Sequence, residues 1–262
     1  MSLDSLQGQM LAYTLLLPRF ISCFVMLPVL SKQMLGGAMI RNGVICSLAL
    51  FAYPMVADTL PPTITALDLA LLVAKEVLLG LLIGFVAAIP FWAIEASGFL
   101  IDNQRGAAMA SIFNPSLASQ TSPTGLLLTQ TLITLFFASG AFLALLSALF
   151  QSYASWPVAH FFPTIGDHWV SFFYSQFNQM LLLCALLAAP LLIAMFLAEF
   201  GLALISRFAP SLNVFVLAMP IKSAVASLLL VIYIKLMMDH AYRQVLAVMD
   251  PLRLLIPILE AR

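Results

Sequence analysis

The sequence predicts an all-α integral membrane protein that is built of helical hairpins. Of its 262 residues, 63% are hydrophobic and only 8% are charged, and the mean hydropathy is +1.08. An average soluble domain carries roughly 25% charged residues, so this chain lacks the polar side chains that would cover a surface facing water. Its apolar residues also gather into long segments, which is the pattern of membrane-spanning helices. We expect residues 1–262 to form one membrane domain.

A spanning helix needs about 20 mostly apolar residues, and about six segments of the chain approach that length. In order along the chain they cover residues 11–30, 44–57, 67–89, 126–150, 177–198 and 214–238. The second segment is short for a span, and the third continues through Pro90 into a further apolar stretch over 91–101. We therefore expect some segments to be kinked or half-crossing hairpins rather than simple spans.

The basic residues give conflicting indications of orientation. Connections rich in Lys and Arg tend to lie in the cytoplasm, and basic residues follow the first, third and fifth segments, whereas residues 58–68 and 151–176 have none. Six complete crossings would then place the C-terminal tail outside, yet the tail region also carries Lys235, Arg243, Arg253 and Arg262. Either the second or the third segment fails to cross, or the helices do not lie in the bilayer as ordinary spans. The remaining alternative is that the tail is an exception to a statistical rule.

Composition and motifs give no support for an enzyme or a nucleic-acid-binding protein. With 11 Lys+Arg against 11 Asp+Glu the formal net charge is zero, which removes the basic surface that nucleic-acid binding needs. The histidines fit no metal-binding spacing, and the sequence contains neither a GxSxG turn nor a phosphate-binding glycine loop. The three cysteines lie in apolar stretches without a CxxC, where they resemble small buried hydrophobic residues. We expect no catalytic residue, no metal and no cofactor.

Ionisable residues in or near the apolar segments are the strongest functional candidates. A charge in hydrocarbon costs about 2.5–17 kcal/mol depending on the method, so each needs a partner, and we expect neighbouring chains to supply the missing ones. Lys75 and Glu76 point about 100° apart on a helix and should find their partners elsewhere, whereas Asp102 and Arg105 can pair as a local clip. A proton relay through acidic residues is an alternative. The candidates for structural or subunit-interface contacts are Arg19, Lys75, Glu76, Glu95, Asp102, Arg105, Glu199, Arg207 and Lys222.

Small residues at four-residue spacing form a second pattern. Gly80, Gly84 and Ala88 lie along one face of the third segment, where they would let another helix approach closely. This pattern predicts a helix–helix contact, although small residues are also frequent in membrane helices in general.

Two segments differ from ordinary loops and termini. Residues 102–125 have a charged start, an apolar middle and an end rich in Ser, Thr and Pro, and Met109, Ile112 and Phe113 lie close together there. Such residues can close a pore by excluding water; a re-entrant segment packed against helices is the alternative. Residues 239–262 carry an apolar stripe of near-helical spacing, and we expect this amphipathic tail to lie on a partner or on the membrane surface.

Three motifs closely resemble the SctT/FliR family of type III secretion export-apparatus proteins. They are IDNQRGAAMAS at 101–111, AEFGLALISRFAPSLNVFVLAMPIKS at 198–223, and LLLPRF at 15–20 followed by LPVLSK at 27–32. The resemblance covers nearly the whole chain and is closer to the virulence-injectisome branch than to the flagellar branch. It implies a subunit of an export gate in the bacterial inner membrane, through which unfolded effector proteins pass and whose helical hairpins are raised out of the bilayer plane.

The resemblance also implies partners and residue roles. SctR/FliP-like and SctS/FliQ-like sister subunits would complete the gate, with contacts to an SctU/FlhB-like switch protein and an SctV/FlhA-like ring protein. The segment that begins at Asp102 is similar to the family's plug loop, with Met109, Ile112 and Phe113 as its seal. Glu199, Arg207 and Lys222 would hold hairpins or subunits together. A stand-alone secondary transporter or ion channel, and an architectural nucleus outside the passage, are the alternatives.

Overall fold

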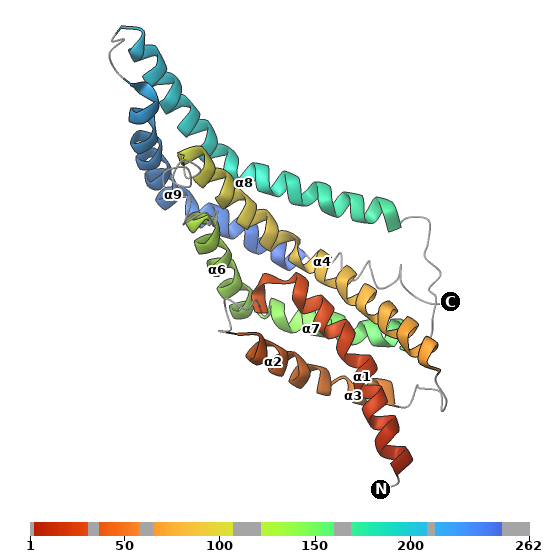
Figure 1. Ribbon diagram of the computed structural model, residues 1–262. Coiled ribbons are helices and arrows are strands. Elements are labelled where there is room, and N and C mark those ends of the chain that lie inside the picture. Colours follow the sequence, from red (N-terminus) through yellow and green to blue (C-terminus); the bar gives the residue numbers. More distant parts are fainter. Residues whose placement is uncertain are drawn as a thin grey trace. The chain divides into compact units, whose positions relative to one another are not determined.

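The computed structural model describes residues 3–30, 37–57, 65–106, 122–159, 169–208 and 213–247, and all regular structure in these ranges is helical (Figure 1). The all-α prediction is confirmed. The elements in order are α1 (Leu3–Met26), the 3-10 helix η1 (Pro28–Leu30), α2 (Ala38–Leu50), α3 (Tyr53–Ala57), α4 (Ala66–Arg105), α6 (Pro123–Ala138), α7 (Ala141–Ser155), α8 (Trp169–Ser206) and α9 (Val214–Ala247).

Fewer helices can cross a membrane than the six segments suggest. Among the described residues α1, α4, α8 and α9 are long and apolar enough, and α6 with α7 can form a fifth span. The second segment is too short, because it is divided into α2, with 13 residues, and α3, with 5. The third segment is not broken: α4 is one helix of 40 residues that contains Pro90. Proline removes one backbone hydrogen bond, which apolar helices tolerate where neighbouring groups satisfy the freed carbonyl.

The contacts within the chain divide it into two compact units. One unit comprises Met1–Ile89, Phe137–Gln176 and Val245–Arg262, and the other comprises Pro90–Phe136 and Phe177–Gln244. Three of the four boundaries fall inside the continuous helices α4, α8 and α9, and the fourth falls near the end of α6. A linker or a change in composition therefore does not mark the division in the sequence.

In the first unit, α1 is the central helix. Helices α2 and α3 pack against it (Figure 1), and its side chains Leu15, Leu16, Phe20 and Phe24 are buried. The early part of α4 approaches α1 closely, because a Cβ atom at Gly80 would collide with the Ser22 hydroxyl and the Arg19 carbonyl, and one at Gly84 would lie 2.6 Å from the Cys23 carbonyl oxygen. Ala88 is fully buried in the same part of α4.

In the second unit, the later part of α4 packs against α6, and α8 and α9 form a hairpin (Figure 1). A Cβ atom at Gly98 would collide with the backbone of Gly125, and the Phe91 and Phe136 rings meet edge-on with centroids 5.3 Å apart. Only 11% of the most apolar window of α9 and 28% of that of α8 is buried. Most of the described apolar side chains of these two helices are therefore at least partly exposed.

Candidate functional site

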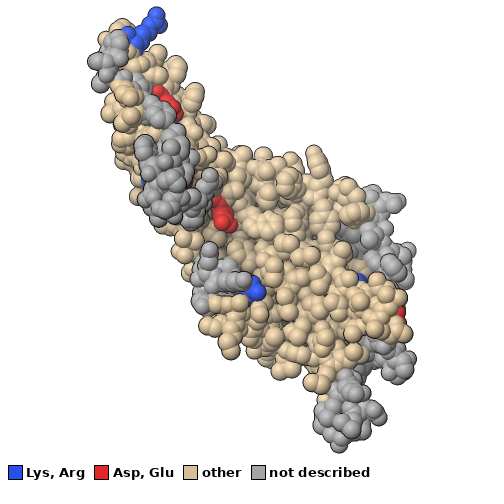
Figure 2. Space-filling model, in the orientation of Figure 1, with Lys and Arg blue, Asp and Glu red and all other residues tan. Residues whose placement is uncertain are grey.

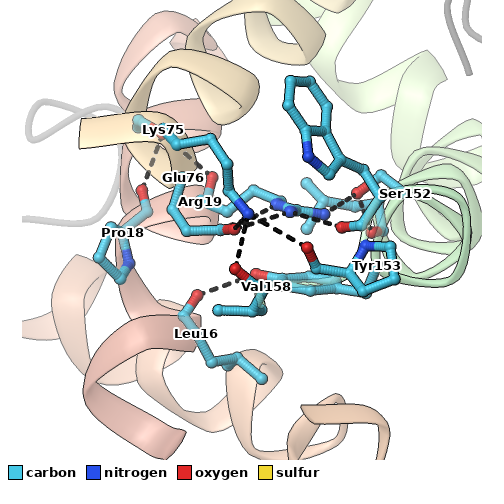
Figure 3. Close-up of polar contacts among 12 residues, drawn as sticks. Leu16, Pro18, Arg19, Lys75, Glu76, Ser152, Tyr153 and Val158 are labelled. Carbon is cyan, nitrogen blue, oxygen red and sulfur yellow. Dashed lines mark hydrogen bonds and ion pairs between the residues drawn. The ribbon is translucent and has the colours of Figure 1, made fainter. Parts of the chain in front are cut away.

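A fully buried arginine joins two helices of the first unit. Arg19 of α1 and Glu76 of α4 both have side chains that are 0% exposed. Arg19 Nε donates to Glu76 Oε2 at 2.6 Å and its Nη2 donates to Oε1 at 3.0 Å, so the guanidinium engages the carboxylate with two parallel hydrogen bonds (Figure 3). This bidentate geometry is the strong form of the Arg–carboxylate pair.

The remaining donors of Arg19 reach α7. Its Nη1 donates to Ser152 Oγ at 2.9 Å and its Nη2 to the Trp156 carbonyl at 3.1 Å. The Tyr153 ring lies beneath the guanidinium, with Arg19 Cζ 3.9 Å from the ring centroid (Figure 3), and the Tyr153 hydroxyl donates to the Leu16 carbonyl at 2.9 Å. Arg19 therefore ties α1 to both α4 and α7, and the group Arg19, Lys75, Glu76, Ser152 and Tyr153 is called the Arg19 cluster below.

Lys75 completes this cluster. Its Nζ lies 3.0 Å from Glu76 Oε1, so these helix neighbours do contact each other, but, as expected, Glu76 also has a partner elsewhere in Arg19. The four-carbon stem of lysine is flexible enough to bend toward the adjacent residue. Lys75 Nζ also donates to the Pro157 carbonyl at 3.1 Å and to the Val158 carbonyl at 2.8 Å.

In the part of the chain that the structure describes, the Arg19 cluster places two cations, Arg19 and Lys75, against one carboxylate, that of Glu76. Three carbonyl oxygens, those of Trp156, Pro157 and Val158, accept from the two cations, and Trp156 is the residue that ends α7. The C-terminal end of a helix carries a partial negative charge on its free carbonyls. The end of α7 therefore offsets the excess positive charge of the cluster.

A second cluster in the other unit centres on Asp102 near the end of α4. Its carboxylate accepts from Ser122 Oγ at 2.7 Å, from the Thr124 backbone N–H at 2.9 Å and from Thr124 Oγ1 at 2.6 Å. Ser122 caps α6, because its Oγ accepts from the Gly125 N–H at 2.9 Å, and Pro123 at the first helical position suits a helix start. Asp102 thus holds the positive N-terminal end of α6.

Arg105 and Lys222 connect this cluster to the α8–α9 hairpin. Arg105 Nη1 lies 3.3 Å from Asp102 Oδ1, while its Nη2 donates to Ser223 Oγ at 3.0 Å and to Ser227 Oγ at 3.2 Å on α9. Lys222, next to Ser223, donates to Glu199 Oε2 of α8 at 3.0 Å. Residues from four helices, α4, α6, α8 and α9, are therefore linked by polar contacts.

The expectation that neighbouring chains supply the missing charges is wrong for most candidates. Arg19, Lys75, Glu76, Asp102, Arg105, Glu199 and Lys222 all have ionic partners within this chain. The physical reason is that helices distant in sequence, such as α1 and α4, bring opposite charges together. Glu95 and Arg207 are exposed, and neither has an ion pair or hydrogen bond from its side chain to the described residues.

Several predicted features fall partly outside the described residues. Met109, Ile112 and Phe113 lie there, as does the tail beyond Ala247; residues 239–247 continue α9. The segment expected over 102–125 is shorter at both ends, because α4 continues to Arg105 and α6 begins at Pro123. Gly106, with φ of +99°, ends α4 in the left-handed conformation that glycine adopts without strain.

The polar clusters have the chemistry of structural contacts. The buried carboxylates are engaged by several donors each, and within the described ranges no three His, Cys, Asp or Glu side chains converge as metal ligands. Sequence reasoning missed the neutral members of the clusters, Ser152, Tyr153, Ser122, Thr124 and Ser223. Of these only the Ser122-Pro123 helix start carries a local sequence signal.

Comparison with known proteins gives a family and several relatives. The sequence model of the family "Bacterial export proteins, family 1" matches residues 10–248. The chain is 70% identical to "Yop proteins translocation protein T" of Yersinia pestis, over 98% of both chains. It is 36% identical to "Secretion system apparatus protein SsaT" of Salmonella typhimurium, over 85% of this chain and 86% of the relative. The identity to "Flagellar biosynthetic protein FliR" of Bacillus subtilis is 28%, over 84% and 85%.

Proposed function

Because this chain belongs to the family of bacterial export proteins, family 1, we propose that it is a non-enzymatic membrane subunit of a type III secretion export apparatus. In this role it forms part of the channel through which unfolded polypeptides leave the cell. The observation that carries the proposal is the 70% identity to a Yop translocation protein over 98% of both chains. At that level of identity, the fold and the assembly surfaces are expected to be shared as well.

The architecture of the described residues supports a role in an assembly. Helices α8 and α9 expose large apolar side chains such as Phe196, Val231 and Ile232, which a lipid or protein environment must cover. Figure 2 shows a largely uncharged surface with a few isolated charges. Both polar clusters fix helices to one another, as a subunit that supports a channel wall requires.

The proposed assembly contains sister subunits of the SctR/FliP-like and SctS/FliQ-like types in the bacterial inner membrane. Its contacts outside the gate are with an SctU/FlhB-like switch protein and an SctV/FlhA-like ring protein. The test is co-expression of this chain with the two sister subunits, followed by purification in mild detergent and imaging. A stable hetero-oligomer with a central passage is expected. Purification of the chain alone despite the presence of both sisters would contradict the proposal.

Met109, Ile112 and Phe113 are proposed as the seal of the closed channel. Their apolar side chains suit a constriction that excludes water and ions, and Asp102 and Ser122 near the two ends of this connection are bonded to each other at 2.7 Å. Replacing Met109 and Phe113 by serine should make cells that express the assembled gate leak ions. An unchanged conductance would remove the seal assignment without affecting membership of the gate.

Two alternatives to a channel subunit, a stand-alone transporter and an architectural nucleus, predict different results in transport and crosslinking experiments. A stand-alone transporter would carry a small solute into vesicles that contain only this purified chain. An architectural nucleus outside the passage would give no adduct when a stalled export substrate is crosslinked to a photoreactive residue at position 113. An adduct at that position together with no solute uptake is the result expected of the proposed channel subunit.

A further inference from the structure

Glu95 is a charged residue in the middle of an apolar helix. From Val77 to Ile101 the sequence of α4 contains no other charged residue. The carboxylate is exposed and has no hydrogen bond or ion pair with the described part of the chain. This differs from Glu76, Asp102 and Glu199, which all have cationic partners.

The packing of α4 holds Glu95 in this orientation. The opposite face of the helix is buried, with Ile94, Ser97 and Ile101 all at 0% exposure. Gly98 lies so close to the backbone of Gly125 in α6 that neither position tolerates a Cβ atom without a shift, and a Cβ atom at Gly125 would lie 2.9 Å from the carbonyl oxygen of Glu95. The backbone of Glu95 therefore faces α6, and its side chain cannot turn inward unless the helix rotates.

Rotation of α4 is opposed by a second set of contacts. Two turns beyond Glu95, Asp102 accepts three hydrogen bonds from Ser122 and Thr124 at the start of α6. Any rotation of α4 about its axis that buried the Glu95 side chain would also move the Asp102 carboxylate away from these donors. The contacts between α4 and α6 therefore keep the Glu95 carboxylate exposed.

The surroundings of Glu95 determine what can cover it. On the exposed side of α4 its neighbours are Ala96, Phe99 and Leu100, and Asn103 follows two turns along. Hydrocarbon tails would suit the apolar neighbours but not an ionised carboxylate, which is costly at membrane depth without a partner. A Lys or Arg side chain suits both the apolar neighbours and the carboxylate. Its apolar stem can pack on Phe99 and Leu100 while its charged end forms an ion pair with Glu95.

We propose that Glu95 and the exposed face of α4 around it form a docking surface for an apolar helix of a neighbouring apparatus subunit, and that this helix supplies a Lys or Arg to pair with the carboxylate. The proposal rests on the proposed function, since it needs a neighbouring subunit. It adds the chemistry of one contact: charge complementarity within an apolar interface.

The test compares variants of the full chain that is co-expressed with the two sister subunits. Glu95→Gln should lower the yield of the purified complex, and Glu95→Lys should lower it by about tenfold or more, because two cations then face each other in an apolar contact. Asp68→Asn is the control, since Asp68 lies on the same helix and bonds to Thr65 of this chain at 2.6 Å. Its yield of complex should equal that of the wild type.

A photoreactive residue at position 95 should form a crosslink that identifies the partner subunit. Replacement of the crosslinked Lys or Arg by Glu should then restore assembly of the Glu95→Lys variant.

The inference is overturned if Glu95→Lys assembles as well as the wild type. If that variant assembles and also changes the ion selectivity, Glu95 lies in the aqueous passage. If the wild-type chain itself fails to join the sisters, the proposed function fails instead. An unchanged melting temperature of the isolated Glu95→Lys chain shows that the variant folds.

Discussion

Charge balance within the Arg19 cluster decides which of its side chains can be removed. Among the described residues the cluster holds Arg19 and Lys75 against Glu76, with the carbonyls at the end of α7 as additional acceptors. Removal of a cation leaves a balanced pair, whereas removal of the carboxylate leaves two buried cations that repel each other. A buried pair that loses one partner is strongly destabilised because the remaining charge is uncompensated.

Three substitutions should therefore rank in a fixed order. Glu76→Gln should lower the free energy of unfolding by about 3–5 kcal/mol, and Arg19→Met by about 1–3 kcal/mol, because the latter leaves buried acceptors without a donor. Lys75→Met should cost least, since the bidentate Arg19–Glu76 pair remains. Thermal unfolding of the three variants in detergent measures the order. If Arg19→Met costs more than Glu76→Gln, the charge-balance account is wrong.

The hydroxyl of Ser122 has two roles that a single substitution can test. It caps α6 and it donates to Asp102. Ser122→Ala should destabilise the chain by about 0.5–2 kcal/mol, the usual cost of losing a helix cap, whereas Ser122→Thr keeps the hydroxyl and should cost less. Equal melting temperatures for Ser122→Ala and the wild type would contradict the assigned roles.

At the residue scale the sequence identifies the charges but not their partners. Arg19 and Glu76 lie 57 residues apart and Arg19 and Ser152 lie 133 apart, and a single sequence contains no periodicity that connects such positions. Asp102 and Arg105 are different, because residues three apart on a helix lie on the same face. Local spacing could therefore predict this pair and the Ser122 cap, while the long-range contacts of the Arg19 cluster required the fold.

At the scale of elements, glycine positions decide how closely α4 and α1 approach. The four-residue spacing of Gly80 and Gly84 predicted a helix contact, and both glycines lie against the backbone of α1. Gly43, in the middle of α2, is different, because a Cβ atom added there would have no atom within 4 Å apart from its chain neighbours and the nearby backbone of its own helix. Replacement of glycine by alanine should therefore lower the stability of the chain at Gly80 and Gly84 and raise it at Gly43.

Gly80→Ala and Gly84→Ala should each destabilise the chain, because the added methyl group meets carbonyl groups of α1 that cannot move without separating the helices. The expected cost is about 1–3 kcal/mol. Gly43→Ala is the matched control, and it should stabilise the chain by about 0.5–1 kcal/mol because alanine favours a helix over glycine. Melting temperatures in detergent provide the comparison, and a loss of stability at Gly43 as large as that at Gly80 would refute the close-approach account.

The lengths of the helices were less predictable than their existence. Pro90 suggested a break in the third segment, yet α4 continues through it for 40 residues. Conversely, the continuous apolar run over 126–150 is divided into α6 and α7, and Gly140 between them has φ of +77°. Proline and glycine lower the intrinsic preference of a residue for the helical conformation by a few kcal/mol at most. Tertiary packing therefore decides whether a helix continues through them.

At the scale of the whole molecule, the number of crossings determines where the tail lies. If all six apolar segments of the sequence crossed the membrane, the basic tail would lie on the other side from the connection that contains Lys32 and Arg41. With α2 too short to cross and α6 with α7 counted as one span, five candidate spans remain. An odd number of crossings returns the tail to the side of Lys32 and Arg41, so most of the basic residues outside the spans then share one side, as the positive-inside rule requires.

We therefore expect the C-terminus to lie in the cytoplasm, together with the connection between α1 and α4. Arg105 and Arg207 would then be the basic residues at the opposite side, a smaller number than on the cytoplasmic side. Fusions of alkaline phosphatase, which is active only outside the cytoplasm, and of a fluorescent protein, which is bright only inside it, test this at three places: after Arg262, within residues 31–36 and within 160–168. All three should report the cytoplasm, because each follows an odd number of crossings. A C-terminal fusion that reports the opposite side from the fusion within 31–36 would mean an even number of crossings, and then α2 or a half-crossing hairpin would have to be counted again.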